Sequence, residues 1–313
     1  MIRVALLGAT GFVGSAVADA MAGNELEVVG ITSPRLRTDA RRAGDLIATA
    51  ARHDAVQSLA QALHGCQVVV NAAGDPDASS LDADRLFGAN ALIPRVVLEA
   101  SARAGVERFV HISSAVVQND KAVLDESEDL RPFSPYSASK VAGEEVLRDH
   151  PPDGVTVVRY RPPSVHAQER QVTRMIRKIA RSRVATVARP GDQPSPQALL
   201  PNVGAAVSFL VTSRLEPPAV VIHPFEGVTS AGLMRDLSGG GDPVCIPRWL
   251  AKLVVATAKF LGRLHQPTAA NARRVEILWF GQGQSPSWLT GQGFVPPVGP
   301  EGWSALGNGP SEP

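Results

Sequence analysis

Short runs of β-branched and aliphatic residues alternate with amphipathic stretches over the first half of the chain. The runs predicted to be strands are Ile2–Leu7, Val28–Ile31, Val68–Asn71, Phe109–Ser113 and Val155–Arg159. Helical patterns lie between them, notably at Ser15–Ala22, Ala55–Leu63, Leu92–Ala104 and Pro135–Arg148. This alternation is typical of a parallel sheet covered by helices on both faces. It predicts an α/β fold with a doubly wound, Rossmann-type sheet.

The alternation of strand and helix patterns ends at about Pro163. A basic segment, a Pro-rich connector and a tail rich in Gly, Pro and Trp follow. We expect residues 1–165 to form the dinucleotide-binding domain, with a late returning segment at about 199–224. Residues 166–198 and 225–313 are then a smaller substrate-binding region. The apolar stretch Trp249–Leu264 is interrupted by basic residues, which favours a packed helix over a helix on a membrane surface.

Composition excludes several classes of protein. The 313 residues are 44% hydrophobic and 19% charged, and 31 Lys+Arg against 30 Asp+Glu give a formal charge of +1, so nucleic acid is not an expected partner. Cys66 and Cys245 are too few for a disulfide framework and form no zinc-binding pair, so no metal is expected. No apolar run is long enough to span a membrane, and no export signal is evident at the N-terminus. These features predict a cytoplasmic enzyme-sized domain.

A glycine-rich turn follows the first predicted strand directly. Its sequence is Gly8-Ala-Thr10-Gly11-Phe12-Val13-Gly14, and a helical pattern comes next. Glycines in this position allow a tight turn and let backbone N–H groups and a helix N-terminus approach a pyrophosphate. The turn predicts binding of a dinucleotide.

The end of the second strand indicates which dinucleotide is preferred. An NAD-binding fold usually places an acidic residue there to hold the ribose hydroxyls. This chain has none; Thr32, Ser33, Arg35 and Arg37 stand there instead. Guanidinium groups match phosphate geometry, so NADP(H) is favoured over NAD(H). The alternative is that these arginines belong to an ordinary solvated loop.

A helix start at Ser134-Pro135 carries Tyr136 and Lys140 four residues apart on one face. A nearby ammonium lowers the pKa of a phenol, and such a tyrosine can exchange a proton with a carbonyl or alcohol oxygen. Ser114 follows a strand whose end faces the same edge of the sheet, where it can bond the reacting oxygen. The alternatives without catalysis are that Tyr136 and Lys140 lie on an ordinary surface helix and that Ser114 only caps a turn.

Together these motifs resemble the short-chain dehydrogenase/reductase superfamily, specifically its extended branch, the epimerase/dehydratase family that acts on nucleotide sugars. The resemblance rests on Gly8–Gly14, Asn71–Gly74, Asn90, His111–Val117, Tyr136–Lys140, Arg161–Val165 and Leu289–Trp303. It implies that Tyr136 is the acid/base, that Lys140 lowers its pKa and holds the ribose, and that Ser114 orients the substrate oxygen. It further implies that Asn90 supports the active site and that Ala72, Ala73, Gly74 and Pro163 line the cofactor.

Several positions depart from the family pattern. Ala115 and Val116 follow Ser114 where dehydratases carry an acidic pair, so dehydration is not expected. Ala51-Arg52-His53 stands at the expected end of strand three, where the family has an aspartate against the adenine. Because of these departures, the resemblance does not identify the substrate of this protein.

Seven basic residues and no acid occur between Arg170 and Arg189. Val172, Met175, Ile176 and Ile179 fall at helical spacing, so this face is expected to pack and to leave the basic face available. In the family, a helix here lies over the diphosphate of the nucleotide sugar. Candidate substrate-binding residues are therefore Ser114, Ser164, His166, Arg174 and Arg177, against the alternative of a solvated basic face.

The sequence therefore predicts an NADPH-dependent reductase of a keto group on a nucleotide-activated deoxysugar. The alternatives are an NDP-sugar epimerase with bound NAD, a 3β-hydroxysteroid-type or other alcohol dehydrogenase, and a dinucleotide-binding module without catalysis. The resemblance also implies a homodimer through the helices Leu92–Ala104 and Pro135–Arg148.

Overall fold

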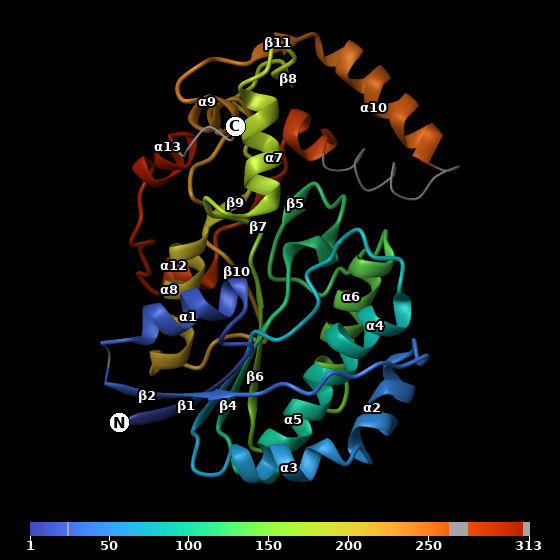
Figure 1. The fold of residues 1–313 in the computed structure, drawn as a ribbon, viewed down its shortest axis with the longest axis vertical. Helices are drawn as coiled ribbons and strands as arrows, with labels where there is room; N and C mark the ends of the chain where they lie inside the picture. The colour runs from blue at the N-terminus through green and yellow to red at the C-terminus, as the bar shows by residue number, and fades with distance from the viewer. Residues whose placement is uncertain (24, 263–274, 309–313) are drawn as a thin grey trace.

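A computed structural model describes residues 1–23, 25–262 and 275–308 (Figure 1). The strands are β1 (Ile2–Leu7), β2 (Leu26–Ile31), β3 (Val68–Asn71), β4 (Arg108–Ile112), β5 (Val123–Leu124), β6 (Thr156–Arg161), β7 (Ser164–His166), β8 (Thr186–Ala188), β9 (Gln197–Leu199), β10 (Val220–Ile222), β11 (Val244–Ile246) and β12 (Gly283–Gln284). The α-helices are α1 (Phe12–Met21), α2 (Ala43–Ala51), α3 (Ala55–Ala62), α4 (Ala83–Phe87), α5 (Ile93–Arg103), α6 (Pro135–Arg148), α7 (Gln171–Ala180), α8 (Leu200–Thr212), α9 (Ser230–Ser238), α10 (Arg248–Gly262), α12 (Trp288–Gly291) and α13 (Glu301–Gly307). A π-helical turn, η1 (Gly88–Leu92), precedes α5, and a 3₁₀ turn, η2 (Ala115–Gln118), follows β4.

The central sheet has six parallel strands in the order β10-β6-β4-β3-β1-β2. The strand order reverses between β1 and β3, because the chain passes from β1 to β2 and then returns to the other side of β1. Ligands of doubly wound sheets bind beyond the carboxyl ends of the strands at such a reversal. The predicted fold class is confirmed.

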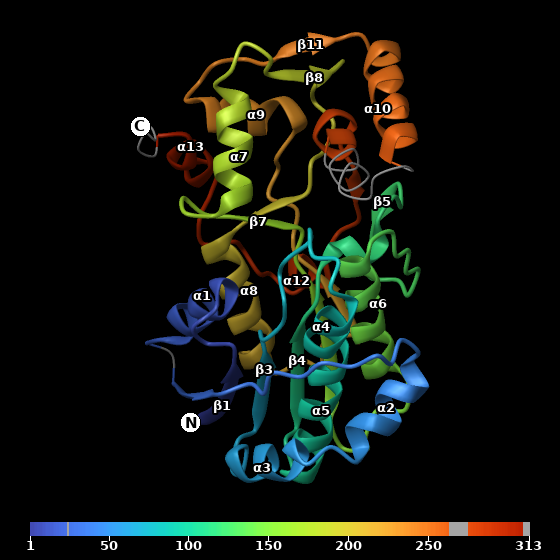
Figure 2. The ribbon, with the colours of Figure 1, turned by 45° about the vertical axis from the view of Figure 1, so that its right-hand side comes forward.

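Helices cover both faces of this sheet (Figures 1 and 2). Alternate strand residues such as Ala5 and Phe109 pack on one face with α2, α3, α5 and α6. Their neighbours, such as Leu6 and Val110, pack on the other face with α1 and α8. Helices α1 and α8 cross closely, since a Cβ on Gly204 would lie 2.3 Å from the Ala16 carbonyl oxygen. Two apolar layers therefore fix the sheet.

The sequence analysis placed Ala51-Arg52-His53 at the end of a strand, and this expectation is wrong. Residues 32–42 run in an irregular extended path, and α2 follows and ends at Ala51. The path packs closely on the π-helical turn, because a Cβ on Gly88 would lie 2.1 Å from the Leu36 carbonyl oxygen. A glycine at position 88 therefore allows this path to lie directly against the π-helical turn.

The later segments form a region beyond the carboxyl ends of the strands (Figure 1). Val187, Leu233, Met234 and Trp303 are among the side chains of its own apolar core, which joins α7, α9 and α13. Within the late part of the chain, α8 and β10 return to the sheet. The division of the chain into two functional regions stays a proposal.

Helix α10 differs from the expectation of a fully packed helix. Ala251 and Val255 are buried, whereas Trp249 is 68% and Leu253 58% exposed. The last two residues of the predicted stretch Trp249–Leu264 lie outside the described residues. Among the described residues, no helix combines the length and apolar character needed to cross a bilayer.

Candidate active site

The glycine turn joins β1 to α1 in a conformation that side chains would prevent. Gly8 has a φ of +78°, and a Cβ there would lie 2.8 Å from the backbone of Ala72 and Ala73. A Cβ on Gly14 would lie 2.0 Å from the Gly8 carbonyl oxygen. The turn, with Thr10 exposed and Phe12 and Val13 opening α1, therefore lies directly against the segment after β3. Such a bare backbone turn at a helix N-terminus has the features on which pyrophosphate groups bind in other proteins.

The segment after β3 is held by side chains beneath it. The Ala73 N–H donates to Asn71 Oδ1 at 3.2 Å, and Asn71 Nδ2 lies 3.2 Å from Nδ1 of the buried His111. Burial lowers the pKa of His111 well below its usual value, helped by the charges of Lys140 and Arg159. A neutral imidazole thus supports Asn71, which positions the predicted cofactor-lining residue Ala73.

Helix α6 begins with a reciprocal cap that positions Tyr136. Ser134 Oγ accepts from the Ser137 N–H at 3.1 Å, and the Ser134 N–H donates to Ser137 Oγ at 2.8 Å. Pro135 occupies the first helical position, where a missing N–H costs nothing. Tyr136 is partly buried and Lys140 is 7% exposed. The amine also lies against the Gly74 backbone, since a Cβ there would be 3.4 Å from Lys140 Nζ.

Asn90 connects the segment after β3 to the start of α6. Its Oδ1 accepts from the Asp75 N–H at 2.9 Å, and its Nδ2 donates to the Asp75 carbonyl oxygen at 3.1 Å. Nδ2 also donates to Ser139 Oγ, which donates to the Tyr136 carbonyl oxygen at 2.7 Å. The π-helical turn that carries Asn90 packs closely on α6, because a Cβ on Gly143 would lie 2.1 Å from the Asn90 carbonyl oxygen.

Ser114 follows β4 and begins η2, which packs against α6. Its Oγ accepts from the Val116 N–H at 3.3 Å, a weak capping bond, and no acceptor for its hydroxyl proton lies among the described residues. The preceding Ser113 donates to the buried carboxylate of Glu144, which also pairs with Arg161 through an Nε–Oε1 contact of 2.9 Å. A buried ion network therefore fixes the strand end beside Ser114.

The charges around Tyr136 differ from the prediction. Burial raises the pKa of Tyr136 to about 12, Arg170 opposes this change, and the Asp75 carboxylate adds to it. Burial likewise lowers the pKa of Lys140 to about 8, against Glu144 and Asp75. In this structure desolvation is the largest cause of the Tyr136 shift and Arg170 is the opposing cation, so the lowering of the phenol pKa by Lys140 stays a prediction.

Asp75 and Arg170 are site residues that the sequence analysis did not single out. Asp75 is partly buried and pairs with the exposed Arg85, with 2.7 Å between Oδ2 and Nε. Arg170 caps α7, and its Cζ lies 4.3 Å from the centroid of the Phe12 ring. The available signals were the position of Asp75 directly after Gly74 and that of Arg170 at the start of the basic run.

The residues after β2 divide into two groups. Ser33 donates to the neighbouring Pro34 carbonyl oxygen, and Thr32 and Arg35 are exposed. Arg37 instead makes a double ion pair with Asp82 at 2.9 Å for each contact. Its guanidinium is therefore occupied, and the prediction that it binds a phosphate is corrected.

Two of the predicted substrate residues are internal. His166 is fully buried, with ring nitrogens bonded to Thr173 at 3.0 Å and Gln197 at 2.8 Å, and burial lowers its pKa to about 4. Arg177 is 6% exposed and donates to Gln168 and to the Leu306 carbonyl oxygen. These two predictions are wrong in this structure, because both side chains satisfy buried partners.

Helix α7 is rotated from the predicted orientation. Its buried residues are Thr173, Arg177 and Ala180, whereas Met175 is 42% and Ile179 37% exposed. The physical reason is that Arg177 reaches a carbonyl at the C-terminus of α13, where a cation is favoured. Ser164 and Arg174 remain on the surface, and Pro163 lies between β6 and β7.

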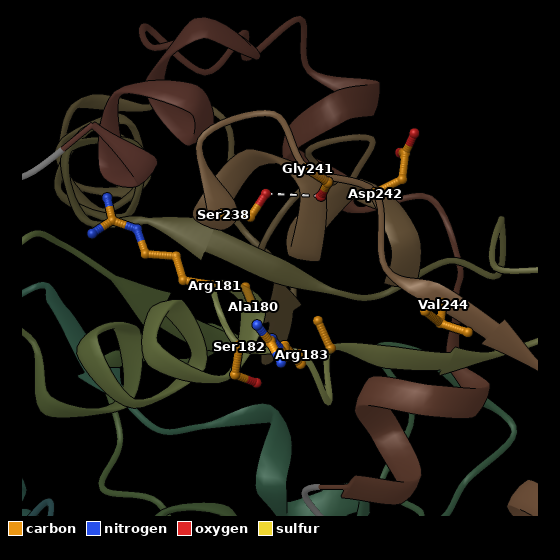
Figure 3. A pocket seen from close by; sticks show the side chains of 9 residues that line it. Ala180, Arg181, Ser182, Arg183, Ser238, Gly241, Asp242 and Val244 are labelled. Carbon is orange, nitrogen blue, oxygen red and sulfur yellow. Dashed lines mark hydrogen bonds between the residues drawn. The ribbon is translucent and has the colours of Figure 1, made fainter.

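A separate surface hollow of about 390 Å³ lies between the end of α7, the end of α9 and the start of β11 (Figure 3). Its charged lining residues are Arg181, Arg183 and Asp242, and Ser238 donates to the Gly241 carbonyl oxygen at 2.8 Å. None of the predicted site residues lines this hollow.

Comparison with known proteins connects this geometry to a family. A model of the NAD dependent epimerase/dehydratase family matches residues 4–195. The chain belongs to this family. The resemblance inferred from the sequence is thereby confirmed, and a nicotinamide dinucleotide is the cofactor type of this extended short-chain dehydrogenase/reductase.

Curated relatives match this family member over part of their length. It is 35% identical over 111 residues to 4-hydroxy-2-methyl-3-oxo-4-farnesyl-3,4-dihydroquinoline-1-oxide ketoreductase of Stigmatella aurantiaca, covering 34% of this chain and 33% of the relative. It is 29% identical over 162 residues to UDP-glucose 4-epimerase of Neisseria gonorrhoeae, covering 47% of this chain and 48% of the relative. The matched regions span about a third to a half of these relatives.

Solved structures share the fold. The dTDP-4-dehydrorhamnose reductase of Bacillus anthracis in complex with NADP has a TM-score of 0.63 and covers 98% of each chain at 17% identity. At this identity the likeness establishes the arrangement of elements in this epimerase/dehydratase family member and nothing about its substrate.

Proposed function

We propose that this protein is an NADPH-dependent reductase of a keto group on a nucleotide-activated sugar. The proposal is carried by one observation: Tyr136 and Lys140 lie on α6 beside the segment that packs on the glycine turn. The similarity to the ketoreductase of S. aurantiaca and to the NADP complex from B. anthracis supports a reductase. The B. anthracis structure and the N. gonorrhoeae relative are both named for nucleotide sugars, which supports the substrate class.

The backbone fits a dinucleotide. Side chains at Gly8 or Gly14 would fill the cradle, and Arg35 is exposed after β2 without a hydrogen bond or ion pair to the described residues. Gly8 to Gly14 would hold the pyrophosphate, Arg35 the 2′-phosphate, and Ala73 and Gly74 the nicotinamide half. The bound dinucleotide supplies the hydride.

The protein's own residues supply the proton and the orientation. The Tyr136 phenol is protonated near neutral pH and is therefore in the form that donates a proton to a carbonyl oxygen, and the neighbouring Arg170 cation opposes the rise of its pKa. Lys140 Nζ, with a pKa of about 8, releases a proton more readily than an exposed lysine and can reprotonate Tyr136. Ser114 donates its free hydroxyl proton to the same carbonyl oxygen, and Asn90 fixes the start of α6.

The first test is a titration with NADPH and, separately, NADH, following tryptophan emission and energy transfer to the reduced nicotinamide. We expect tighter binding of NADPH. Arg35→Asp should reduce this preference by about tenfold, the value of one charge-assisted phosphate contact. The exposed Arg42 provides the control Arg42→Gln, which should keep the preference. An unchanged preference in Arg35→Asp refutes the role of Arg35.

The catalytic role is tested with Tyr136→Phe. This variant should retain NADPH affinity and lose turnover of a keto-sugar nucleotide by about 100-fold or more, because it lacks only the proton donor. Turnover equal to that of the wild-type protein contradicts the assignment.

Two other candidates are each favoured by one relative. The similarity to UDP-glucose 4-epimerase favours an epimerase, which would carry NAD through purification. The S. aurantiaca relative is named for a farnesylated quinoline oxide, which favours an apolar keto substrate. Mass spectrometry of the nucleotide released from the purified protein and a parallel screen of both substrate classes separate these candidates.

A further inference from the structure

The helices α5 and α6 are almost completely covered within a single chain. In α5, which the structure describes throughout, Arg103 is the only exposed residue, and in the equally complete α6 it is Arg148. Each arginine is the last residue of its helix. The family resemblance implies a homodimer through these two helices, but a stable interface covers about 800 Å² on each partner and has an apolar core. Two terminal arginines cannot supply such a core.

The cover comes from residues 36–51, which we call the strap; it runs from the irregular path after β2 through α2 (Figures 1 and 2). Leu46 and Ala50 of α2 are fully buried, in the apolar cluster that also contains residues of α5 and α6. The Ala51 carbonyl oxygen at the end of the strap accepts from Arg103 Nη2 at 3.4 Å. The exposed residues of α2 are small or polar, namely Gly44, Asp45, Ala48, Thr49 and Ala51.

Ion pairs hold the first part of the strap along α4. Arg37 makes its double ion pair with Asp82, and Arg41 pairs with the Asp84 carboxylate. The Arg41 Cζ also lies 4.7 Å from the centroid of the Phe87 ring. These pairs are partly exposed, so each contributes little to stability. The buried side of α2 therefore provides most of the attachment of the strap.

Close backbone contacts connect the strap to the candidate active site. A Cβ on Gly88 would lie 2.1 Å from the Leu36 carbonyl oxygen, and a Cβ on Gly143 would lie 2.1 Å from the Asn90 carbonyl oxygen. The π-helical turn η1 thus contacts the strap through Gly88 and α6 through Asn90. The turn that carries Asn90 is held by segments of its own chain.

We propose that the strap takes the place of a second subunit on α5 and α6, so that the candidate active site is complete within one chain. A dimer through these helices would have to remove the strap, which would expose the buried side of α2 and break the pairs of Arg37 and Arg41. The proposal concerns the assembly of the protein and does not depend on which substrate it uses.

The first test measures the mass of the protein in solution by light scattering over a range of concentrations. We expect the wild-type mass to be that of one chain. The double variant Ala48→Glu, Thr49→Glu adds two charges per chain to exposed positions of α2. A wild-type mass of two chains that falls to one chain in this variant places a subunit contact over the strap and overturns the proposal. A mass that is equal in both proteins agrees with it, provided that the strap is docked.

Limited digestion with trypsin measures this docking, because Arg37 and Arg41 are cleavage sites in the part of the strap before α2. Leu46→Ala removes buried apolar contacts of α2 and should raise the cleavage rate at both arginines by about 30-fold or more. Thr49→Ala, at an exposed position of the same helix, is the matched control and should leave the rate unchanged.

A second variant leaves the apolar core intact. Asp84→Asn removes the carboxylate that pairs with Arg41 and should raise the cleavage rate there by about two- to fivefold, the range for an exposed ion pair. Cleavage rates that equal the wild-type rate in both Leu46→Ala and Asp84→Asn would show that the strap is not docked and would overturn the proposal, whatever the mass. Faster cleavage confined to the strap sites supports it.

Discussion

Replacing Lys140 by methionine is expected to stabilise the folded protein while removing its activity. Lys140 is 7% exposed, and burial lowers its pKa from 10.5 to about 8 despite the nearby carboxylates of Glu144 and Asp75. One pKa unit corresponds to about 1.4 kcal/mol, so the buried amine costs about 3 kcal/mol of folding free energy at neutral pH. Methionine has a similar length and carries no such cost.

The pH dependence of this cost has a definite sign. Below pH 8 the amine is protonated in both states and the full cost applies. Between pH 8 and 10.5 the unfolded chain binds more protons than the folded chain, so the free energy of unfolding of the wild-type protein rises with pH. Lys140→Met lacks this contribution, and its advantage over the wild-type protein should therefore shrink across that interval.

The measurement is urea denaturation of both ligand-free proteins at pH 7 and pH 10. The difference in unfolding free energy should be about 3 kcal/mol at pH 7 and clearly smaller at pH 10. Taking the difference removes the contributions of groups that titrate equally in both proteins. Lys178→Met replaces an exposed lysine and should change stability by less than about 0.5 kcal/mol at either pH. A variant that is less stable at pH 7, or a difference independent of pH, refutes the reasoning.

Two further substitutions test the buried network and the glycine turn. Glu144→Gln leaves the Arg161 guanidinium without its buried anion and should lower the free energy of unfolding by about 3 kcal/mol, as measured by urea denaturation. The control Glu145→Gln, on the same helix, should change the free energy of unfolding little. Equal effects of the two substitutions would contradict the buried pair. Gly14→Ala places a Cβ 2.0 Å from the Gly8 carbonyl oxygen and should abolish NADPH binding. In the control Gly44→Ala, the new Cβ meets no atom within 4 Å, so this variant should bind NADPH normally. NADPH binding retained by Gly14→Ala would refute the role of the glycine turn in cofactor binding.

The sequence predicts those features that depend on local chemistry. The observed bounds of β1, β3 and α6 equal the predicted ones, because the strands are mostly apolar and α6 starts at Pro135 directly after its N-cap Ser134. The Gly8–Gly14 turn can likewise be recognised from the sequence, because its glycines permit close backbone contacts within the turn and with one neighbouring segment. The class of fold and the Tyr136–Lys140 pair follow from such local patterns.

Features that depend on distant partners were not predictable in this way. The orientation of α7 is set by the bond from Arg177 to a carbonyl of α13, which is 129 residues away in sequence. Arg37 is paired with Asp82, 45 residues away, so a loop that looks suited to a phosphate contains one occupied and one available arginine. Periodicity and composition carry no information about such pairings.

The charges at the site bear on the protonation state in which each direction of the reaction begins. Burial raises the pKa of Tyr136 and lowers that of Lys140, so both groups are driven toward their neutral forms in the ligand-free protein. A neutral phenol donates a proton, as reduction of a keto group requires, whereas oxidation of an alcohol requires the phenolate to accept one. Arg170 is the cation that opposes the raised pKa of Tyr136. A higher pKa keeps the phenol protonated but makes it a weaker acid, so the nearby Arg170 cation, which lowers the Tyr136 pKa, favours release of the proton to a keto oxygen.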